Sequence, residues 1–208
     1  MTLERWWFFV GVAFLLCGTP GPNMLHIMAR SVELGFRRSI PAMAGCLAAI
    51  GAALAASAAG LSALLIAVPA AFELLRYAGA AYLLYLGIKA WRAPVGPVDI
   101  VDQPVAARGA WELMRGGFLV GISNPKLILF AAAFLPQFVS PNAPQAPQFA
   151  ILVVTFIALE TFWYCVYALG GRSIARLLTR PALKRGFNRL TGIIFIAFGI
   201  GLLTARIA

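Results

Sequence analysis

The stretch GTPGPN, residues 18–23, interrupts one apolar segment of the chain, and GISNPK, residues 121–126, interrupts another. A proline inside a helix removes a backbone donor and clashes with the preceding turn, which costs about 3 kcal/mol. Pro20 and Pro22 in the first stretch and Pro125 in the second therefore predict two broken helices. A helix that begins again after a break exposes unpaired N–H groups, which together form a partial positive charge.

The composition places these breaks in a membrane protein. Of the 208 residues, 62% are hydrophobic and 12% are charged, and the mean hydropathy is +0.87. A soluble domain has about 45–50% apolar residues and roughly a quarter charged residues. The composition therefore excludes the soluble enzyme classes.

Six segments are long and apolar enough to span a bilayer, which requires about 20 residues. They are residues 6–29, 40–68, 72–91, 113–135, 149–170 and 190–207. The first and the fourth of these contain the proline breaks. We therefore expect an all-α, polytopic membrane protein with six transmembrane helices.

The six segments divide into two halves of one transmembrane domain. Residues 93–112 form a long polar linker, which leaves three segments in residues 1–92 and three in residues 113–208. Because each half has an odd number of spans, the second half enters the membrane from the opposite side, and two related halves are inverted relative to each other. The sequence thus predicts inverted three-helix repeats, each with a Pro-broken first helix. Paired breaks of this kind indicate a transporter binding site, although two kinks without a ligand are the alternative.

The basic residues predict how the chain is oriented. Thirteen of them lie in alternate connections, against three on the other side, and the formal net charge is +10. The first group is Arg30, Arg37, Arg38, Lys89, Arg92, Arg108, Arg115, Arg172, Arg176, Arg180, Lys184, Arg185 and Arg189; the second is Arg5, Arg76 and Arg206. Cytoplasmic connections carry the excess of basic residues, so the linker is expected in the cytoplasm and both termini outside. Contact with anionic lipid headgroups then explains the charge, and a nucleic-acid partner is not needed.

Two charged residues, Lys126 and Glu160, fall within predicted spans. A charge at mid-bilayer costs about 2.5–3.5 kcal/mol on insertion scales, so such residues usually have a function. Three interpretations compete. In the first, the two form a structural ion pair. In the second, Glu160 carries a coupled proton. In the third, Lys126 and the half-helix N-termini bind the carboxylate of a substrate while Glu160 binds the amino group of the same substrate. We favour a combination of the last two.

Other polar residues near the breaks complete the candidate site. Asn23 and Asn124 are placed to cap the half-helices or to bind a ligand. Tyr164 follows Glu160 by one helical turn, where it belongs either to an interfacial aromatic belt or to a cavity wall. The candidate substrate-binding residues are Pro20, Gly21, Pro22, Asn23, Asn124, Pro125, Lys126, Glu160 and Tyr164, with Glu160 also the proton-coupling residue.

The remaining motifs indicate packing rather than chemistry. With one histidine and scattered acids, the sequence offers no metal-ligand cluster, nucleotide loop or nucleophile–base arrangement, so we expect no catalytic residues, metal or cofactor. The cysteines, Cys17, Cys46 and Cys165, are expected to be small buried hydrophobes. A ladder of small residues, Gly45, Ala49, Ala53 and Ser57, predicts close helix packing, and such faces are compatible with a homodimer.

Several motifs along the chain resemble those of the LysE/RhtB family of amino-acid exporters. They are PGPN (20–23), GFRR (35–38), Gly45, GAAYLLYLG (79–87), NPK (124–126), FLPQF (134–138), Gly192 and FGIG (198–201). The resemblance covers nearly the whole chain. Ser39 and Ala49 stand where that family more often has glycine, and we expect altered helix packing there.

The resemblance implies an exporter in the bacterial inner membrane that is driven by the proton gradient. It leaves the exported amino acid undefined. The leading hypothesis is a secondary active exporter of amino acids or their derivatives that works by alternating access at a midplane site. A small-solute channel and a membrane-embedded enzyme are the alternatives. A channel needs a ring of charged residues and an enzyme needs a catalytic cluster, and neither pattern is present in the sequence.

Overall fold

The first broken helix consists of α1 (Leu3–Gly18) and α2 (Pro22–Leu34), whose axes meet at 53°. The Thr2 side chain caps α1 by accepting a hydrogen bond from the Arg5 N–H. Pro22 begins α2 at a position where the missing N–H costs nothing. The predicted break at Pro20 and Pro22 is confirmed, and the helix pair extends further at both ends than the predicted span.

The structure used here is a computed structural model. It describes residues 1–67, 77, 80–81, 83–85, 87–93, 109–140, 143–179 and 181–204. Every regular element within these ranges is helical, which confirms the all-α part of the predicted fold. Most of the predicted linker, residues 94–108, and parts of the third and sixth predicted spans lie outside the described residues.

The second broken helix begins with α5 (Ala110–Ile122) and continues, after the break, as α6 (Pro125–Leu129). A π-helical turn (Phe130–Phe134) and a 3-10 turn (Leu135–Phe138) extend α6. The two parts are bent by 60°. The predicted break at Pro125 is confirmed, whereas the change to a π turn was not predicted.

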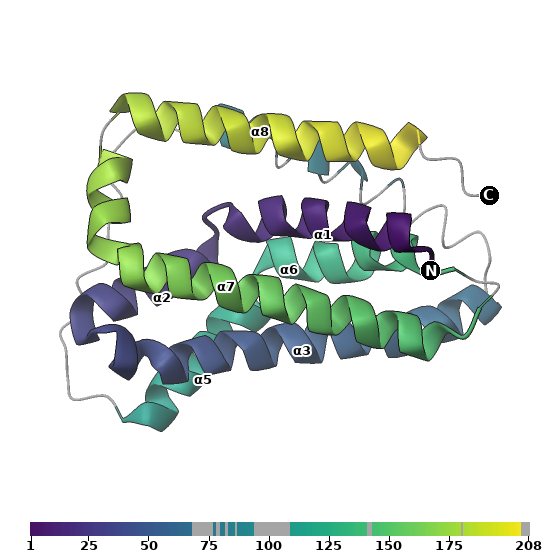
Figure 1. Cartoon of the computed structure of the whole chain (residues 1–208), viewed down its shortest axis with the longest axis horizontal. Coiled ribbons are helices and arrows are strands. Elements are labelled where there is room, and N and C mark those ends of the chain that lie inside the picture. Colours follow the sequence, from purple (N-terminus) through teal and green to yellow (C-terminus); the bar gives the residue numbers. More distant parts are fainter. Residues whose placement is uncertain are drawn as a thin grey trace.

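The three longer helices are α3 (Phe36–Ala67), α7 (Gln145–Thr179) and α8 (Pro181–Thr204). Of these, α3 and α7 pack against the broken helices. Figure 1 shows that α1, α3, α7 and α8 share one long direction. Gly35, with a φ of 83°, separates α2 from α3, and this left-handed backbone conformation favours glycine. Because α8 begins at Pro181, Lys184, Arg185 and Arg189 are helical rather than in the loop that the sequence predicted.

The membrane-spanning elements agree in part with the prediction. Among the described residues, α3 and α7 are each long and apolar enough to cross a membrane, and the two bent pairs pass the same test. The predicted six-helix repeat architecture remains a prediction, because the third segment is only partly described. Its described residues between 77 and 91 are helical.

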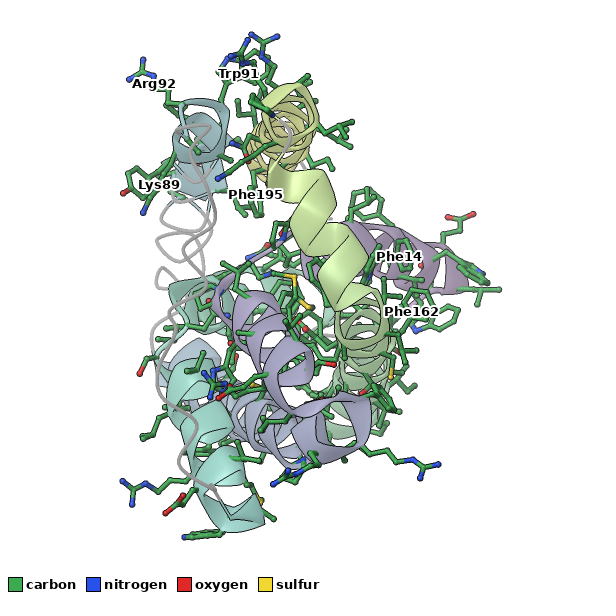
Figure 2. All side chains as sticks on the ribbon, turned by 90° about the vertical axis from the view of Figure 1, so that its left-hand side faces the viewer. Phe14, Lys89, Trp91, Arg92, Phe162 and Phe195 are labelled. Atoms are coloured by element: carbon green, nitrogen blue, oxygen red, sulfur yellow. The ribbon has the colours of Figure 1, made fainter. Side chains whose placement is uncertain are left out.

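The helical residues between 77 and 91 pack closely against α8. A Cβ atom added to Gly87 would lie 2.9 Å from the Gly192 carbonyl oxygen, and one added to Gly199 would lie 3.1 Å from that of Ala80. In Figure 2, α8 and the segment with Lys89, Trp91 and Arg92 lie together at one end of the molecule, and Phe195 points from α8 toward the other helices. Phe195 is buried there.

The most extensive packing between described elements joins α3 to α5. A Cβ atom added to Gly45 would overlap the Met114 carbonyl oxygen, and one added to Gly117 would overlap that of Ala42. Ala49 is accommodated because it faces Gly121, where an added Cβ would lie 2.6 Å from the Ala49 methyl. The small-residue ladder on α3 therefore brings the two backbones into contact, as predicted.

Replacing Gly117 by alanine should lower the free energy of unfolding by about 1–3 kcal/mol, because overpacking at this contact forces the backbones apart. Gly116 is the matched control, since an added Cβ there meets nothing within 4 Å. Both variants gain the same helix propensity, so the difference isolates the packing contact. Thermal unfolding in detergent micelles measures it, and equal melting temperatures of the two variants would contradict the described contact.

Candidate functional site at the two helix breaks

The C-terminal end of α1 is held by a side chain from the second break. The Lys126 Nζ atom donates to the carbonyl oxygens of Leu16 and Thr19, at 3.1 and 3.2 Å. On α7, the Tyr167 hydroxyl donates to the Gly18 carbonyl oxygen at 2.9 Å. The Leu16 oxygen also accepts from the N–H and the hydroxyl of Thr19, at 3.2 and 2.7 Å. The last carbonyls of a helix lack the usual partner one turn further on and carry a partial negative charge. A cation and a hydroxyl therefore stabilise this end of the helix.

A chain of hydrogen bonds connects the second break to the first and then to α7. Asn124 is the N-cap of α6, and its Oδ1 accepts from the Lys126 N–H at 3.0 Å. Its Nδ2 donates to Asn23 Oδ1 at 3.0 Å, and Asn23 Nδ2 donates to the Tyr164 hydroxyl at 3.0 Å. Asn23, Asn124 and Tyr164 are 4%, 1% and 0% exposed. The two breaks, about a hundred residues apart, thus meet in the interior.

The two asparagines have different roles. Asn124 caps a helix, as the sequence allowed, whereas Asn23 lies inside α2 and bridges to Asn124 and Tyr164. The N-cap of α2 is Gly21, which provides no side-chain cap. A Cβ atom added to Gly21 would lie 3.5 Å from the Lys126 Nζ atom. The positive end of α2 and the Lys126 ammonium are therefore close together.

Glu160 lies in the middle of α7 and is 3% exposed. Its Oε2 atom has no hydrogen-bond partner among the described residues. Groups from four elements act on its carboxyl: Cys17 and Tyr164 offer hydrogen bonds, Lys126 is the nearby cation, and Cys46 interacts electrostatically. Within the described chain, Lys126 and Glu160 form no ion pair closer than 4.0 Å. The structural ion pair that the sequence allowed is not formed in this structure.

The structure brings four buried residues, Asn23, Asn124, Glu160 and Tyr164, and the half-buried Lys126 into one cluster. The prolines contribute through the backbone, since Pro22 and Pro125 begin the half-helices and Pro20 lies between α1 and α2. The uncapped end of α2, the Lys126 cation and the Glu160 carboxyl together present opposite charges within a small polar site.

Sequence reasoning missed Tyr167, Cys17 and Cys46 as members of this site. A signal for Tyr167 was available, because residues three and four apart lie on one face of a helix. Tyr164 follows Glu160 by four residues and Tyr167 follows Tyr164 by three, so all three share one face. Cys17 and Cys46 are buried, as predicted, whereas Cys165 is only partly buried. Cys46 also donates from its Sγ atom to the Gly117 carbonyl oxygen at 3.3 Å. Its proximity to Glu160 depends on tertiary packing that the sequence does not indicate.

The family model described as LysE type translocator matches residues 12–206. The chain belongs to this family. This confirms the resemblance found in the sequence, and it supports a membrane transporter that exports small solutes.

Two curated relatives of this LysE-type chain carry functional names. The homoserine/homoserine lactone efflux proteins of Salmonella typhimurium and Salmonella typhi are each 34% identical to it, over 99% of both chains. An uncharacterized membrane protein of Vibrio cholerae is 28% identical over 99% of this chain and 100% of its own. No solved structure gives a significant match.

The hydrogen bond between the two breaks can be measured with a double-mutant cycle of Asn23→Ala and Asn124→Ala. Each single change should destabilise the LysE-type chain, and Asn124→Ala should lose about 1 kcal/mol more for the helix cap. Because the two amides share one hydrogen bond, the losses should be non-additive by about 0.5–3 kcal/mol. Free energies of unfolding in detergent micelles provide the measurement. Strictly additive losses would show that the breaks do not interact through these amides.

Proposed function

We propose that this chain is a secondary active exporter of amino acids or their derivatives, driven by the proton gradient, with its substrate site at the two helix breaks. The observation that carries the proposal is the buried Glu160 Oε2 atom, which has no partner in the described chain. A buried polar atom without a partner calls for an explanation, and an absent ligand is one. A proton or the ammonium group of a substrate provides the missing partner.

An amino acid fits the charges of this site. Its ammonium group would pair with Glu160. Its carboxylate would lie at the uncapped N-terminus of α2, where helix ends bind anions. An ammonium side chain has three donors, and Lys126 uses two of them on α1. The third donor is then available for the substrate carboxylate.

The names of the Salmonella relatives agree with recognition of the amino group. Homoserine and homoserine lactone both have a protonated amine, but only homoserine has a free carboxylate. A site that accepts both solutes must recognise the amine, and Glu160 is the buried acid at the two breaks. We therefore propose small solutes of this kind as substrates of the present chain.

One carboxyl group can couple the proton to the substrate because it cannot hold both. With the carboxylate ionised, the site binds the substrate ammonium; with the carboxyl protonated, that attraction is lost. A proton entering from outside would release the substrate outward, and loss of the proton to the cytoplasm would restore the site. The result is an exchange of protons for substrate.

The wider organisation of the transporter is part of the same proposal. Two inverted repeats, residues 1–92 and 113–208, would alternate around a midplane site, joined by a cytoplasmic linker over residues 93–112. Both termini would face the periplasm of a bacterial inner membrane, as the distribution of basic residues predicts. A homodimer in contact with membrane lipid is compatible with the exposed apolar surface.

Replacing Glu160 by glutamine should abolish proton-coupled export, because the amide neither carries the proton nor pairs with an ammonium. The measurement is transport of homoserine and other amino acids by the protein in vesicles under an imposed pH gradient. Glu112→Gln is the control, since Glu112 is an exposed acid in the first turn of α5. Full export by Glu160→Gln, at an equal amount in the membrane, would refute the coupling role.

The amine requirement predicts a second result in the same vesicles. Homoserine lactone should be exported, and its N-acetylated form should be exported at least tenfold more slowly, because an amide nitrogen carries no charge for Glu160. Collapse of the pH gradient should stop concentrative export. Flux that continues unchanged without the gradient would instead indicate a channel.

A further inference from the structure

At the end of α1, two backbone carbonyl oxygens lie around a positive charge. In transporters with broken helices, unwound carbonyls and the C-terminal ends of half-helices coordinate monovalent cations. Here the oxygens of Leu16 and Thr19 both accept from the Lys126 Nζ atom. A side chain from the other half of the molecule therefore supplies the cation.

We propose that Lys126 is a built-in cation that occupies this carbonyl site and positions the two breaks for transport. The proposal rests on the export function proposed above, and it gives Lys126 a role besides contact with the substrate. The ammonium takes the place of a free ion, so export by the native protein needs no added Na⁺ or K⁺.

The surroundings of Lys126 are built for this side chain. Its backbone N–H is fixed by the Asn124 cap at the start of α6. The side chain passes Gly21, and a Cβ atom added there would be in van der Waals contact with its Cε and Nζ atoms, at 3.5 Å from each. It then reaches α1, so one residue connects the start of α6 to the end of α1.

The position of the Lys126 ammonium also leaves the Glu160 carboxylate available for a substrate. Lys126 acts electrostatically on Glu160, but the two form no ion pair within 4.0 Å in the described structure. The lysine therefore contributes positive charge to the site without occupying the carboxylate. A direct ion pair would compete with the substrate ammonium, and the carbonyl oxygens of α1 hold the lysine where it does not.

Truncation of the Lys126 side chain tests the proposed cation site. Lys126→Ala leaves room for a propylammonium ion, which has the atoms that the variant lacks. Export by Lys126→Ala should fall at least tenfold, and propylammonium, or Na⁺ at higher concentration, should restore it severalfold by raising the maximal rate. Lys126→Met fills the space without a charge and should stay inactive with either ion. Lys89→Ala, which changes an exposed lysine, should respond to neither.

A second measurement does not depend on transport. In micelles at constant ionic strength, balanced with bulky N-methylglucamine, propylammonium should raise the melting temperature of Lys126→Ala in a saturable way and leave the native protein unchanged. If the native protein exports nothing, the proposed function fails, while this shift still tests the cation site. The inference is overturned if no cation stabilises or rescues Lys126→Ala, or if Lys126→Met exports like the native protein.

Discussion

Every backbone polar group inside a membrane must find a partner within the protein, because hydrocarbon offers none. A broken helix leaves unpaired carbonyl groups at the end of its first part and unpaired N–H groups at the start of its second part. This chain contains two such helices. The carbonyls at the end of α1 are satisfied by Lys126 and Tyr167, and the first turn of α6 is capped by Asn124. Lys126 follows the second break and donates to carbonyl oxygens of the first, so the first break is satisfied in part by the second half of the chain. The second break is capped by its own Asn124.

The same constraint concentrates the chemistry of the protein in one place. Groups that satisfy the breaks are polar, and burial makes their interactions strong. Hydrogen bonds join Asn23 to both Asn124 and Tyr164. Glu160 keeps a carboxylate oxygen without a partner in the described chain. In the function proposed above, this atom is the part of the cluster that binds the solute, whereas the two asparagines hold the breaks together.

Local features were predictable from the sequence, and tertiary contacts were less so. The breaks follow from proline chemistry, which acts within one turn, and their positions at Pro20, Pro22 and Pro125 were predicted correctly. The π turn over Phe130–Phe134 was not, because its sequence, FAAAF, contains no residue that disfavours an ordinary helix. One carbonyl oxygen of the π turn, that of Ala131, accepts a hydrogen bond from a residue distant in sequence, Ser57 on α3.

The candidate site shows the same division. Lys126 and Glu160 could be selected because charge is rare in apolar segments, and Tyr164 because it follows Glu160 by one turn. The matching breaks predicted that Asn23 and Asn124 belong to one site, but not that their amides form a direct hydrogen bond, because that depends on tertiary packing between residues 101 positions apart. Cys17 and Cys46 gave no signal either, since a buried thiol resembles any small apolar residue in sequence.

The contact between α3 and α5 limits how the molecule can change shape. Along this seam, peptide groups of the first half lie against peptide groups of the second, at Gly45, Gly117 and Gly121. Side chains can adjust when helices slide, but main chains in contact cannot pass one another without separating. In the alternating access proposed above, α3 and α5 would therefore stay in contact, and one half would rotate against the other about this seam.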